Sequence, residues 1–308
     1  MTTNAIQSSH IYSTYFAPRG RSRIYTLGMQ IAQLYLSPFD QIIGFIGEAG
    51  SGKSVLIKGM FPGIELTNDD DGVNVRPLPL LEQEYETGFF TPHTYHLDIR
   101  FETGFHQLSE LADAVQLAVR RGKRIIIEHF DLIYPLLGVN ANLLIGVGEQ
   151  IVITRPNLFG PLPQDLCEIV YPSLAYRLMA HSAEDLCEYA MTQEQMLACS
   201  HGDIRHGFVL EFNEHQPDID IPALEARVNE LIRADLPIDY YDESHILLGG
   251  VQHYCTGPRT HVRSTGRIIG FRLLDHFIYD HFHKTYMLVG CVGDDSEENI
   301  RKLEKIHG

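Results

Sequence analysis

Residues 47–54 read GEAGSGKS, which matches the phosphate-binding pattern G-x-x-x-x-G-K-[ST] at every fixed position. Glycines allow consecutive backbone N–H groups to curl around a phosphate where a Cβ atom would clash, and the lysine adds charge for the β- and γ-phosphates. The serine hydroxyl can bind Mg²⁺, and the N-terminal end of a following helix favours the same anion. The segment predicts a nucleoside-triphosphate site, with expected contacts at Gly47, Gly50, Ser51, Gly52, Lys53 and Ser54.

A loop of this kind needs an acidic partner for its metal ion. Three places in the sequence offer one: Asp98 in HTYHLDIRF, Glu128 at the end of RIIIE, and the run Asp69–Asp71. A carboxylate at a strand end beside the loop can bind Mg²⁺ directly or through water, or polarise an attacking group. A run of aspartates is also typical of a solvated turn. The candidate catalytic residues are therefore Asp98 and Glu128.

The segments around these residues predict the elements that position them. Gln41–Gly47 (QIIGFIG) is a short apolar run typical of a buried parallel strand, and Ser51–Met60 predicts a helix that starts on the loop. Arg124–Glu128 and Gln150–Thr154 predict two more buried strands, and apolar residues at helical spacing predict a helix over Gln107–Arg121. Strands that alternate with helices indicate a three-layer α/β domain with a parallel sheet.

This alternation stops at PNLFGPLP, residues 156–163, because three prolines and a glycine cannot continue a helix or a central strand. We therefore expect a nucleotide-binding domain over residues 1–160 and a second domain over residues 161–308. In the second domain, Ala223–Ala234 has the apolar spacing of an amphipathic helix. Two strands are expected farther on, at Gly266–Leu274 and Tyr286–Val292. This arrangement predicts an α+β domain.

Composition limits the class of protein. With 44% apolar and 21% charged residues among 308, the chain has the composition of a globular protein. No apolar stretch is long enough for a membrane helix, and no secretory signal is recognised, so we expect a cytoplasmic protein without a membrane partner. A net charge of −16 repels polyanions at long range, so DNA is not expected as a partner. The odd, widely spaced cysteines suit a reducing compartment: Cys167, Cys187, Cys199, Cys255 and Cys291.

Three motifs in the first domain carry a resemblance to a known family. The loop GEAGSGKS, the later HLDIR and the strand IIIEHF together resemble the small P-loop ATPase of the bacterial threonylcarbamoyladenosine tRNA-modification system. That family has a His-x-Asp-x-Tyr-Arg element and a strand that ends in Glu-Trp. Here isoleucine stands where tyrosine is expected, and His129 replaces the tryptophan.

The resemblance covers about residues 40–135 and implies roles for four side chains. Lys53 and Ser54 would bind phosphates and Mg²⁺, Asp98 would serve the metal, and Glu128 would lie near the γ-phosphate. No Asn-Lys-x-Asp element for reading guanine is present, which favours ATP over GTP.

The second domain resembles another family. The segments EARVNELIRADLPI (225–238) and CTGPRTHVRSTGRIIGF (255–271), with the strand GFVLEF (207–212), resemble the editing domain of alanyl-tRNA synthetase, its second additional domain. That family has His-x-x-x-His on a helix, a Val-Asn-x-x-Ile-Arg helix, and Cys-Gly-Gly-Thr-His-Val followed by Thr-Gly. The resemblance covers roughly residues 175–292.

In that family two histidines, the cysteine and the last histidine bind zinc. By resemblance His181 matches the first histidine, Cys255 the cysteine and His261 the last histidine, whereas Asp185 stands where the second histidine belongs. The spacing is C-x5-H where the family has C-x3-H. Because imidazole, thiolate and carboxylate all bind Zn²⁺, the implied metal ligands are His181, Asp185, Cys255 and His261.

Together these features favour an ATPase or ATP-dependent phosphotransferase that uses Mg²⁺ and is joined to an editing-domain-like module. The module would recognise a tRNA, an aminoacylated compound or a small amino-acid-like ligand, with Zn²⁺ as a further cofactor. One alternative is a small-molecule kinase in which Asp70 or Asp98 is the base and the second domain is a substrate lid. Another is a regulatory binding module with a nucleotide-operated switch and slow hydrolysis.

Overall fold

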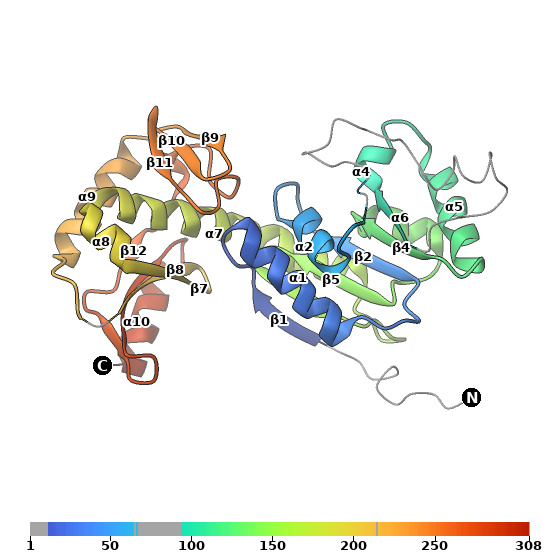
Figure 1. The fold of residues 1–308 in the computed structure, drawn as a ribbon, viewed down its shortest axis with the longest axis horizontal. Helices are drawn as coiled ribbons and strands as arrows, with labels where there is room; N and C mark the ends of the chain where they lie inside the picture. Colours follow the sequence, from blue (N-terminus) through green and yellow to red (C-terminus); the bar gives the residue numbers. More distant parts are fainter. Residues whose placement is uncertain (1–11, 65, 67–93, 214, 308) are drawn as a thin grey trace. The chain divides into compact units, whose positions relative to one another are not determined.

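The computed structural model describes residues 12–64, 66, 94–213 and 215–307. The run Asp69–Asp71, and with it the candidate base Asp70, lies outside these residues. The chain is an α/β protein with three sheets in its described part, and it divides into two compact units (Figure 1). The first unit comprises Met1–Tyr15 and Ser22–Pro172, and the second comprises Phe16–Arg21 and Ser173–Gly308.

The division comes later than residue 160, and its position has a physical reason. Helix α7 (Pro163–Ala190) begins at the third proline of PNLFGPLP. Its first turns bury Leu166, Cys167 and Val170 in the hydrophobic core of the first unit. The proline-rich stretch therefore ends the strand pattern, but the chain leaves the first core only within the helix.

The first unit is built on a six-stranded sheet with the order β1-β6-β5-β2-β4-β3. Its strands are β1 (Tyr12–Phe16), β2 (Ile42–Ile46), β3 (Thr94–Asp98), β4 (Arg124–Glu128), β5 (Leu143–Val147) and β6 (Gln150–Thr154). Its helices are α1 (Arg21–Tyr35), α2 (Lys53–Met60), α4 (Ile99–Glu102), α5 (Leu108–Arg120) and α6 (Phe130–Leu137).

The sheet is mixed, which corrects the expectation of a parallel sheet. β2 pairs in parallel with β4 and β5, and β3 pairs in parallel with β4. β6, however, runs antiparallel to β5. Only Gly148 and Glu149 separate the two strands, and Gly148 N donates to Gln150 O at 3.0 Å. So short a connection can form a hairpin but not a parallel crossover.

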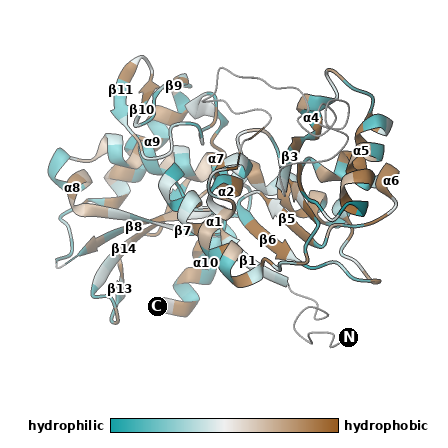
Figure 2. Cartoon of the chain, turned by 45° about the vertical axis from the view of Figure 1, so that its right-hand side comes forward, coloured by the Kyte–Doolittle hydropathy of each residue, from teal (hydrophilic) through white to brown (hydrophobic). Residues whose placement is uncertain are grey.

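Apolar patterning explains the central elements. Every residue of β2 is buried, as expected for a strand with neighbours on both edges and covered faces. The predicted helix at Gln107–Arg121 is observed as α5, where the Glu110 side chain accepts a hydrogen bond from the backbone N–H of Gln107 at 3.1 Å. In Figure 2 the strands β5 and β6 of this sheet are mostly brown, whereas α5 carries both brown and teal residues.

Two glycines set how closely α1 and α2 pack. A Cβ atom added at Gly28 would lie 2.4 Å from the carbonyl oxygen of Leu56, and one at Gly59 would lie 2.2 Å from that of Tyr25. Because both obstacles are backbone atoms, neither can move aside as a side chain could. The two helices are therefore in direct backbone contact beside the glycine-rich loop.

The second unit contains two antiparallel sheets, with the orders β11-β10-β9 and β12-β14-β8-β7, and β13 pairs with β14. The strands are β7 (Cys199–Ile204), β8 (Gly207–Asn213), β9 (Ile238–Asp242), β10 (His245–Leu248), β11 (Val251–Tyr254), β12 (Arg272–Leu273), β13 (Ile278–Asp280) and β14 (Thr285–Cys291). The helices are the later part of α7, α8 (Gln193–Ala198), α9 (Ile221–Arg233), the short η1 (Thr265–Arg267) and α10 (Ser296–His307).

The amphipathic helix predicted at Ala223–Ala234 is observed as α9, which begins after Asp220, whose side chain accepts a hydrogen bond from Ala223 N. The strand predicted at Gly266–Leu274 is reduced to β12, preceded by η1. Thr265 explains the difference, because its hydroxyl donates to Leu231 O at 2.7 Å and accepts from Leu236 N at 2.9 Å. These bonds tie the segment to the end of α9 in place of a strand ladder.

Candidate functional site

The glycine-rich loop connects the buried strand β2 to helix α2 in the first unit. Gly50 and Gly52 have φ values of 79° and 95°, in the left-handed region that favours glycine. At Gly47 a Cβ atom would lie 2.5 Å from the carbonyl oxygen of Val147 at the end of β5. Three glycines are thus required by backbone geometry, and a glycine-rich turn of this kind can point backbone N–H groups at an anion.

Lys53 is the first residue of α2 and is 4% exposed. Its Nζ donates to the carbonyl oxygens of Gly47 at 3.0 Å and Glu48 at 2.9 Å, and lies 3.6 Å from Oε2 of Glu128. Burial lowers the pKa of Lys53, and the charges of Glu128 and Asp98 oppose this shift. The loop backbone and one carboxylate therefore hold the ammonium group in place.

Glu128 ends β4, the strand next to β2. Its Oε1 accepts a hydrogen bond from the Ser54 hydroxyl at 3.1 Å and lies 3.1 Å from Nε2 of His96. Burial alone would raise the pKa of Glu128, but the hydrogen bond and charge of His96, the charge of Lys53 and the Ser54 hydroxyl lower it to about 2. This buried carboxylate is therefore ionised at neutral pH.

Asp98 ends β3 and is the neighbour of Glu128 in the parallel pairing of β3 with β4. Its Oδ1 accepts a hydrogen bond from Phe101 N at 3.1 Å, which begins α4. Burial raises the pKa of Asp98, and the adjacent charge of Glu128 raises it further. The two carboxylates thus differ: Glu128 is held ionised, whereas Asp98 accepts a proton more readily than an ordinary aspartate.

His129 follows Glu128 and has a left-handed backbone with a φ of 56°. Burial, Lys53 and Arg100 lower the pKa of His129 to about 4, so its imidazole is neutral at pH 7. Ligand atoms of Asp98, Glu128 and His129 lie within 4.8 Å of one another, a spacing at which they could hold a cation.

Arg100 pairs with Glu48, the second residue of the glycine-rich loop. Its two terminal nitrogens donate to the two carboxylate oxygens at 2.9 and 3.3 Å, and both side chains are more than two-fifths exposed. The hydrogen bond from Arg100 lowers the pKa of Glu48. This exposed pair connects α4 to the second residue of the loop.

The structure thus brings together the predicted loop residues with Asp98 and Glu128. Sequence reasoning did not single out His96 or Arg100. His96 stands two residues before Asp98 on β3, on the same face of the strand, so the spacing of HLD contained a signal for it.

The second unit contains a buried cluster of charged side chains around Arg19, which is 1% exposed. The guanidinium of Arg19 donates to Glu184 and Asp185 on α7 and, at 3.1 Å, to Sγ of Cys255. Burial would lower the pKa of Arg19, but the charges of Glu184 and Cys255 raise it above its ordinary value. Arg19 was not predicted, because it lies far from the other members in sequence and no motif includes it.

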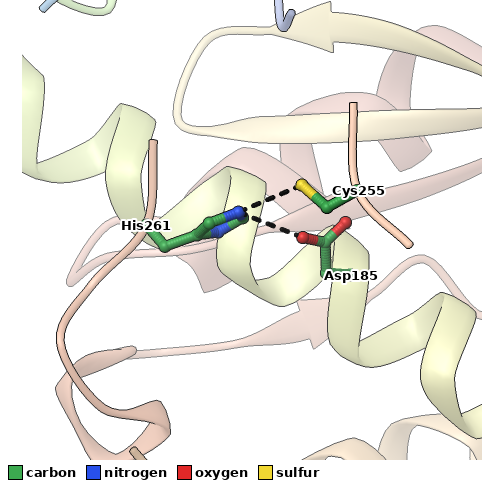
Figure 3. Close-up of side chains that lie close together, drawn as sticks. All are labelled: Asp185, Cys255 and His261. Carbon is green, nitrogen blue, oxygen red and sulfur yellow. Dashed lines mark hydrogen bonds and ion pairs between the residues drawn. The ribbon is translucent and has the colours of Figure 1, made fainter. Parts of the chain in front are cut away.

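Three of the four predicted zinc ligands meet in this cluster (Figure 3). His261 Nε2 lies 3.2 Å from Sγ of Cys255 and 3.3 Å from Oδ2 of Asp185. In a tetrahedral zinc centre, ligands about 2.0–2.3 Å from the ion are about 3.3–3.8 Å from one another. Two of the three separations are therefore close to what a zinc ion requires, and all three ligand atoms lie within 4.8 Å of one another.

The environment of His261 orients its ring. Ser182 Oγ donates to Leu178 O at 2.8 Å, so Nδ1 of His261, 3.3 Å from Ser182 Oγ, is assigned as the donor of that contact. Burial lowers the pKa of His261 well below its usual range. A neutral ring protonated at Nδ1 points the Nε2 lone pair at a carboxylate oxygen and a sulfur atom, an arrangement that a cation would stabilise.

His181 is the fourth predicted ligand, and it has a different nearest partner. Its Nε2 lies 3.5 Å from Oδ1 of Asp203 on β7. Burial lowers the pKa of His181 to about 4, against the hydrogen bond that its ring donates to Asp203, which raises it. His181 therefore belongs to the same buried region but is not part of the Asp185–Cys255–His261 group.

Comparisons with known proteins give little further information. No family model and no curated protein matches the sequence. Solved structures that resemble the chain include an amino transferase from Eubacterium rectale, with a TM-score of 0.23 and 13% sequence identity. The alignment covers 71% of this chain and 64% of that chain, so this chain spans less than two thirds of its length. Separately, within the described residues no helix is both long and apolar enough to cross a membrane.

Proposed function

We propose that the first unit is a three-layer P-loop domain that binds ATP with Mg²⁺ and transfers the terminal phosphate to water or to an acceptor. The observation that carries the proposal is the contact of Ser54 Oγ with Glu128 Oε1 at 3.1 Å, with Lys53 Nζ 3.6 Å from the same carboxylate. In P-loop enzymes the hydroxyl after the lysine and an acidic residue at a nearby strand end together hold Mg²⁺. The loop position between β2 and α2 supports the same assignment.

The geometry favours a division of roles between the two carboxylates. Glu128 contacts Ser54 and is ionised, so we assign Mg²⁺ binding to Glu128 and Ser54. This differs from the sequence resemblance, which implied that Asp98 serves the metal. Asp98, whose pKa is raised, is suited to accept a proton from the attacking group. Lys53 and the loop amides bind the phosphates, and Mg²⁺ neutralises the charge that develops on the transferred group.

For the second unit, we propose that Asp185, Cys255 and His261 hold a zinc ion. The buried Oδ2 of Asp185 has no hydrogen-bond partner among the described residues, and the Nε2 lone pair of His261 faces it. Three protein ligands leave a fourth position for a ligand, where zinc can polarise a carbonyl group or a water. From the sequence resemblance, we propose an aminoacylated or amino-acid-like compound, including a charged tRNA end, as the ligand.

Phosphate release from ATP by the purified chain tests the first assignment. We expect Mg²⁺-dependent release, and a loss of about 10²-fold or more in Glu128→Gln, because a preorganised charge at the reacting phosphate is removed. Glu110→Gln, an exposed glutamate on α5, is the matched control and should have wild-type turnover. Glu128→Gln should still bind ATP without Mg²⁺.

Other outcomes of the same assay separate the alternatives. An active Glu128→Gln together with an inactive Asp98→Asn would reverse the assigned roles. Absence of ATP binding by the wild-type chain would contradict the proposal. Stimulation by bulk tRNA would support coupling to the second unit, and a phosphorylated small molecule detected by mass spectrometry would identify a kinase.

A further inference from the structure

A second group of metal-binding side chains surrounds Glu188, one turn beyond Asp185 on α7. Glu188 is buried, and its Oε1 contacts Nε2 of His201 and lies 4.0 Å from Sγ of Cys199. Nε2 of His253 lies 3.9 Å from the other oxygen, Oε2. One carboxylate therefore faces two imidazoles and a thiol.

Three separate elements contribute these side chains. Cys199 and His201 are two residues apart on β7, so they point to the same side of the strand. His253 lies on β11 and Glu188 on α7. Ligand atoms of Glu188, Cys199 and His201 lie within 4.8 Å of one another, as do those of Asp185, Glu188 and His253. The fold thus brings distant parts of the sequence to a single carboxylate.

His253 gives an independent reason to expect a ligand at this position. Its Nε2 is buried and has no hydrogen-bond partner among the described residues, and the side chain is only 8% exposed. A buried polar atom without a partner costs about 1–3 kcal/mol of stability. The distance of 3.9 Å from Nε2 of His253 to Oε2 of Glu188 is too long for a hydrogen bond. A cation between the two would satisfy both groups.

Charge balance favours a cation as well. Glu184, Asp185 and Glu188 lie within five positions on one helix, all buried, and Arg19 is the arginine that contacts the first two. Buried carboxylates are stable only when a partner compensates their charge. Glu188 has His201 as its contact, and a divalent ion held by both would place a full cationic charge beside this third carboxylate.

We propose that Glu188, Cys199 and His201 bind a second divalent transition-metal ion of the zinc class, with His253 facing the other oxygen of the same carboxylate. Sulfur and nitrogen donors favour zinc over Mg²⁺ or Ca²⁺, which take oxygen ligands. Three protein donors of this kind occupy three of the four positions of a tetrahedral zinc shell, as in the Asp185–Cys255–His261 group. The second ion would hold α7 and β7 together.

The test is metal content of the full chain after chelator treatment, reconstitution with Zn²⁺ or Co²⁺, and dialysis. If both groups bind, the wild-type chain should hold two ions, and Cys199→Ser, His201→Ala and the isosteric Glu188→Gln should each hold one fewer. Loss of Cys199 should also weaken the thiolate-to-cobalt absorption of the Co²⁺ form. His283→Ala, which removes an exposed histidine paired with Asp280 at 2.7 Å, is the control and should change neither measurement.

The design separates this proposal from the zinc assigned to Cys255. Loss of one ion in Cys199→Ser but not in Cys255→Ser would support the second centre and contradict the first. Unchanged metal content in all three variants, or a wild-type chain whose ions are lost entirely with Cys255→Ser, would overturn the proposal. Circular dichroism of each variant checks that a loss of metal is not caused by unfolding. If Cys199→Ser misfolds, Glu188→Gln still tests the proposal, because it keeps the side-chain size.

Discussion

The candidate site of the first unit is formed mainly by backbone groups, and that of the second unit by side chains. In the first unit the site is largely backbone: a loop of consecutive residues whose glycines adopt left-handed angles, with Lys53 held by two loop carbonyls. In the second unit it consists of side chains from α7, β7, β11, the segment from Cys255 to His261 and the segment around Arg19, most of them buried. The first kind of site depends on local geometry, and the second on long-range packing and on charge compensation.

This difference predicts how each site fails. If the loop binds phosphate as proposed, removal of one side-chain charge should lower its affinity and affect its fold little. A buried cluster of acids, histidines and an arginine is itself part of the folded core, so removing one member leaves an uncompensated charge. Function and stability should therefore separate in the first unit and change together in the second.

The strongest test of this contrast is Arg19→Met. It leaves Glu184 and Asp185 buried without their cation, so the second unit should lose about 3–5 kcal/mol of stability. Urea-dependent hydrogen exchange of peptides from β8 and β14 measures this loss within the second unit. Arg259→Met, which removes an arginine that is half exposed and 3.8 Å from Glu243, should cost less than about 1 kcal/mol. Equal effects of the two substitutions would contradict the contrast.

Acid should weaken the second unit through its neutral histidines. The folded pKa of His181, about 4, lies below the ordinary value of 6.5, so its stabilisation is complete above about pH 6.5 and is lost as pH falls toward 4. In the metal-free chain this residue should account for about 2 kcal/mol of stability lost between pH 7 and pH 5. His181→Gln should flatten that dependence in hydrogen exchange, whereas substitution of the half-exposed His276 should leave it unchanged.

In the first unit, Lys53→Ala should separate binding from folding. A charge-assisted contact of this kind contributes about 1.5–3 kcal/mol, so ATP affinity should fall about ten- to a hundred-fold in calorimetry. Lys58→Ala, on the last turn of the same helix, should bind ATP as the wild type does. Unchanged ATP affinity in Lys53→Ala would remove the basis for the phosphate-binding assignment.

The smallest effect is expected for the exposed pair of Arg100 and Glu48. Glu48→Gln should change the stability of the first unit by less than about 1 kcal/mol, because solvent screens both partners. Thermal unfolding at low and at high salt measures this effect, which should shrink further as salt rises. A loss comparable to that of Arg19→Met would mean that burial does not control the strength of these pairs.

The sequence predicts the first site better than the second, because the first is built from contiguous motifs and the second from residues far apart in the chain. The glycine loop, β4 and α5 follow from contiguous patterns, and the Ser54–Glu128 contact follows from adjacent parallel strands. The strands β3 and β5 were not predicted as separate elements, and the antiparallel direction of β6 depends on a two-residue turn that apolar patterning does not encode.

In the second unit, the resemblance identified Asp185, Cys255 and His261, which converge. It could not identify Arg19 or the partners of Glu188, since their proximity arises only when α7, β7 and β11 pack together. The same packing explains why His181 lies outside the group of three ligands: its acidic partner, Asp203, lies on a strand that the sequence did not predict.

The backbone contact of α1 with α2 at Gly28 and Gly59 limits which substitutions the protein can tolerate at these two positions. Lys53 begins α2, so any displacement of that helix by a new methyl group also displaces Lys53, to which we assign phosphate binding. A random-mutagenesis screen for loss of nucleotide binding should therefore recover substitutions at these two glycines as often as in the loop itself, although neither belongs to the motif. Second-site suppressors should be rare, since the obstructing atoms are main-chain carbonyls that every amino acid retains.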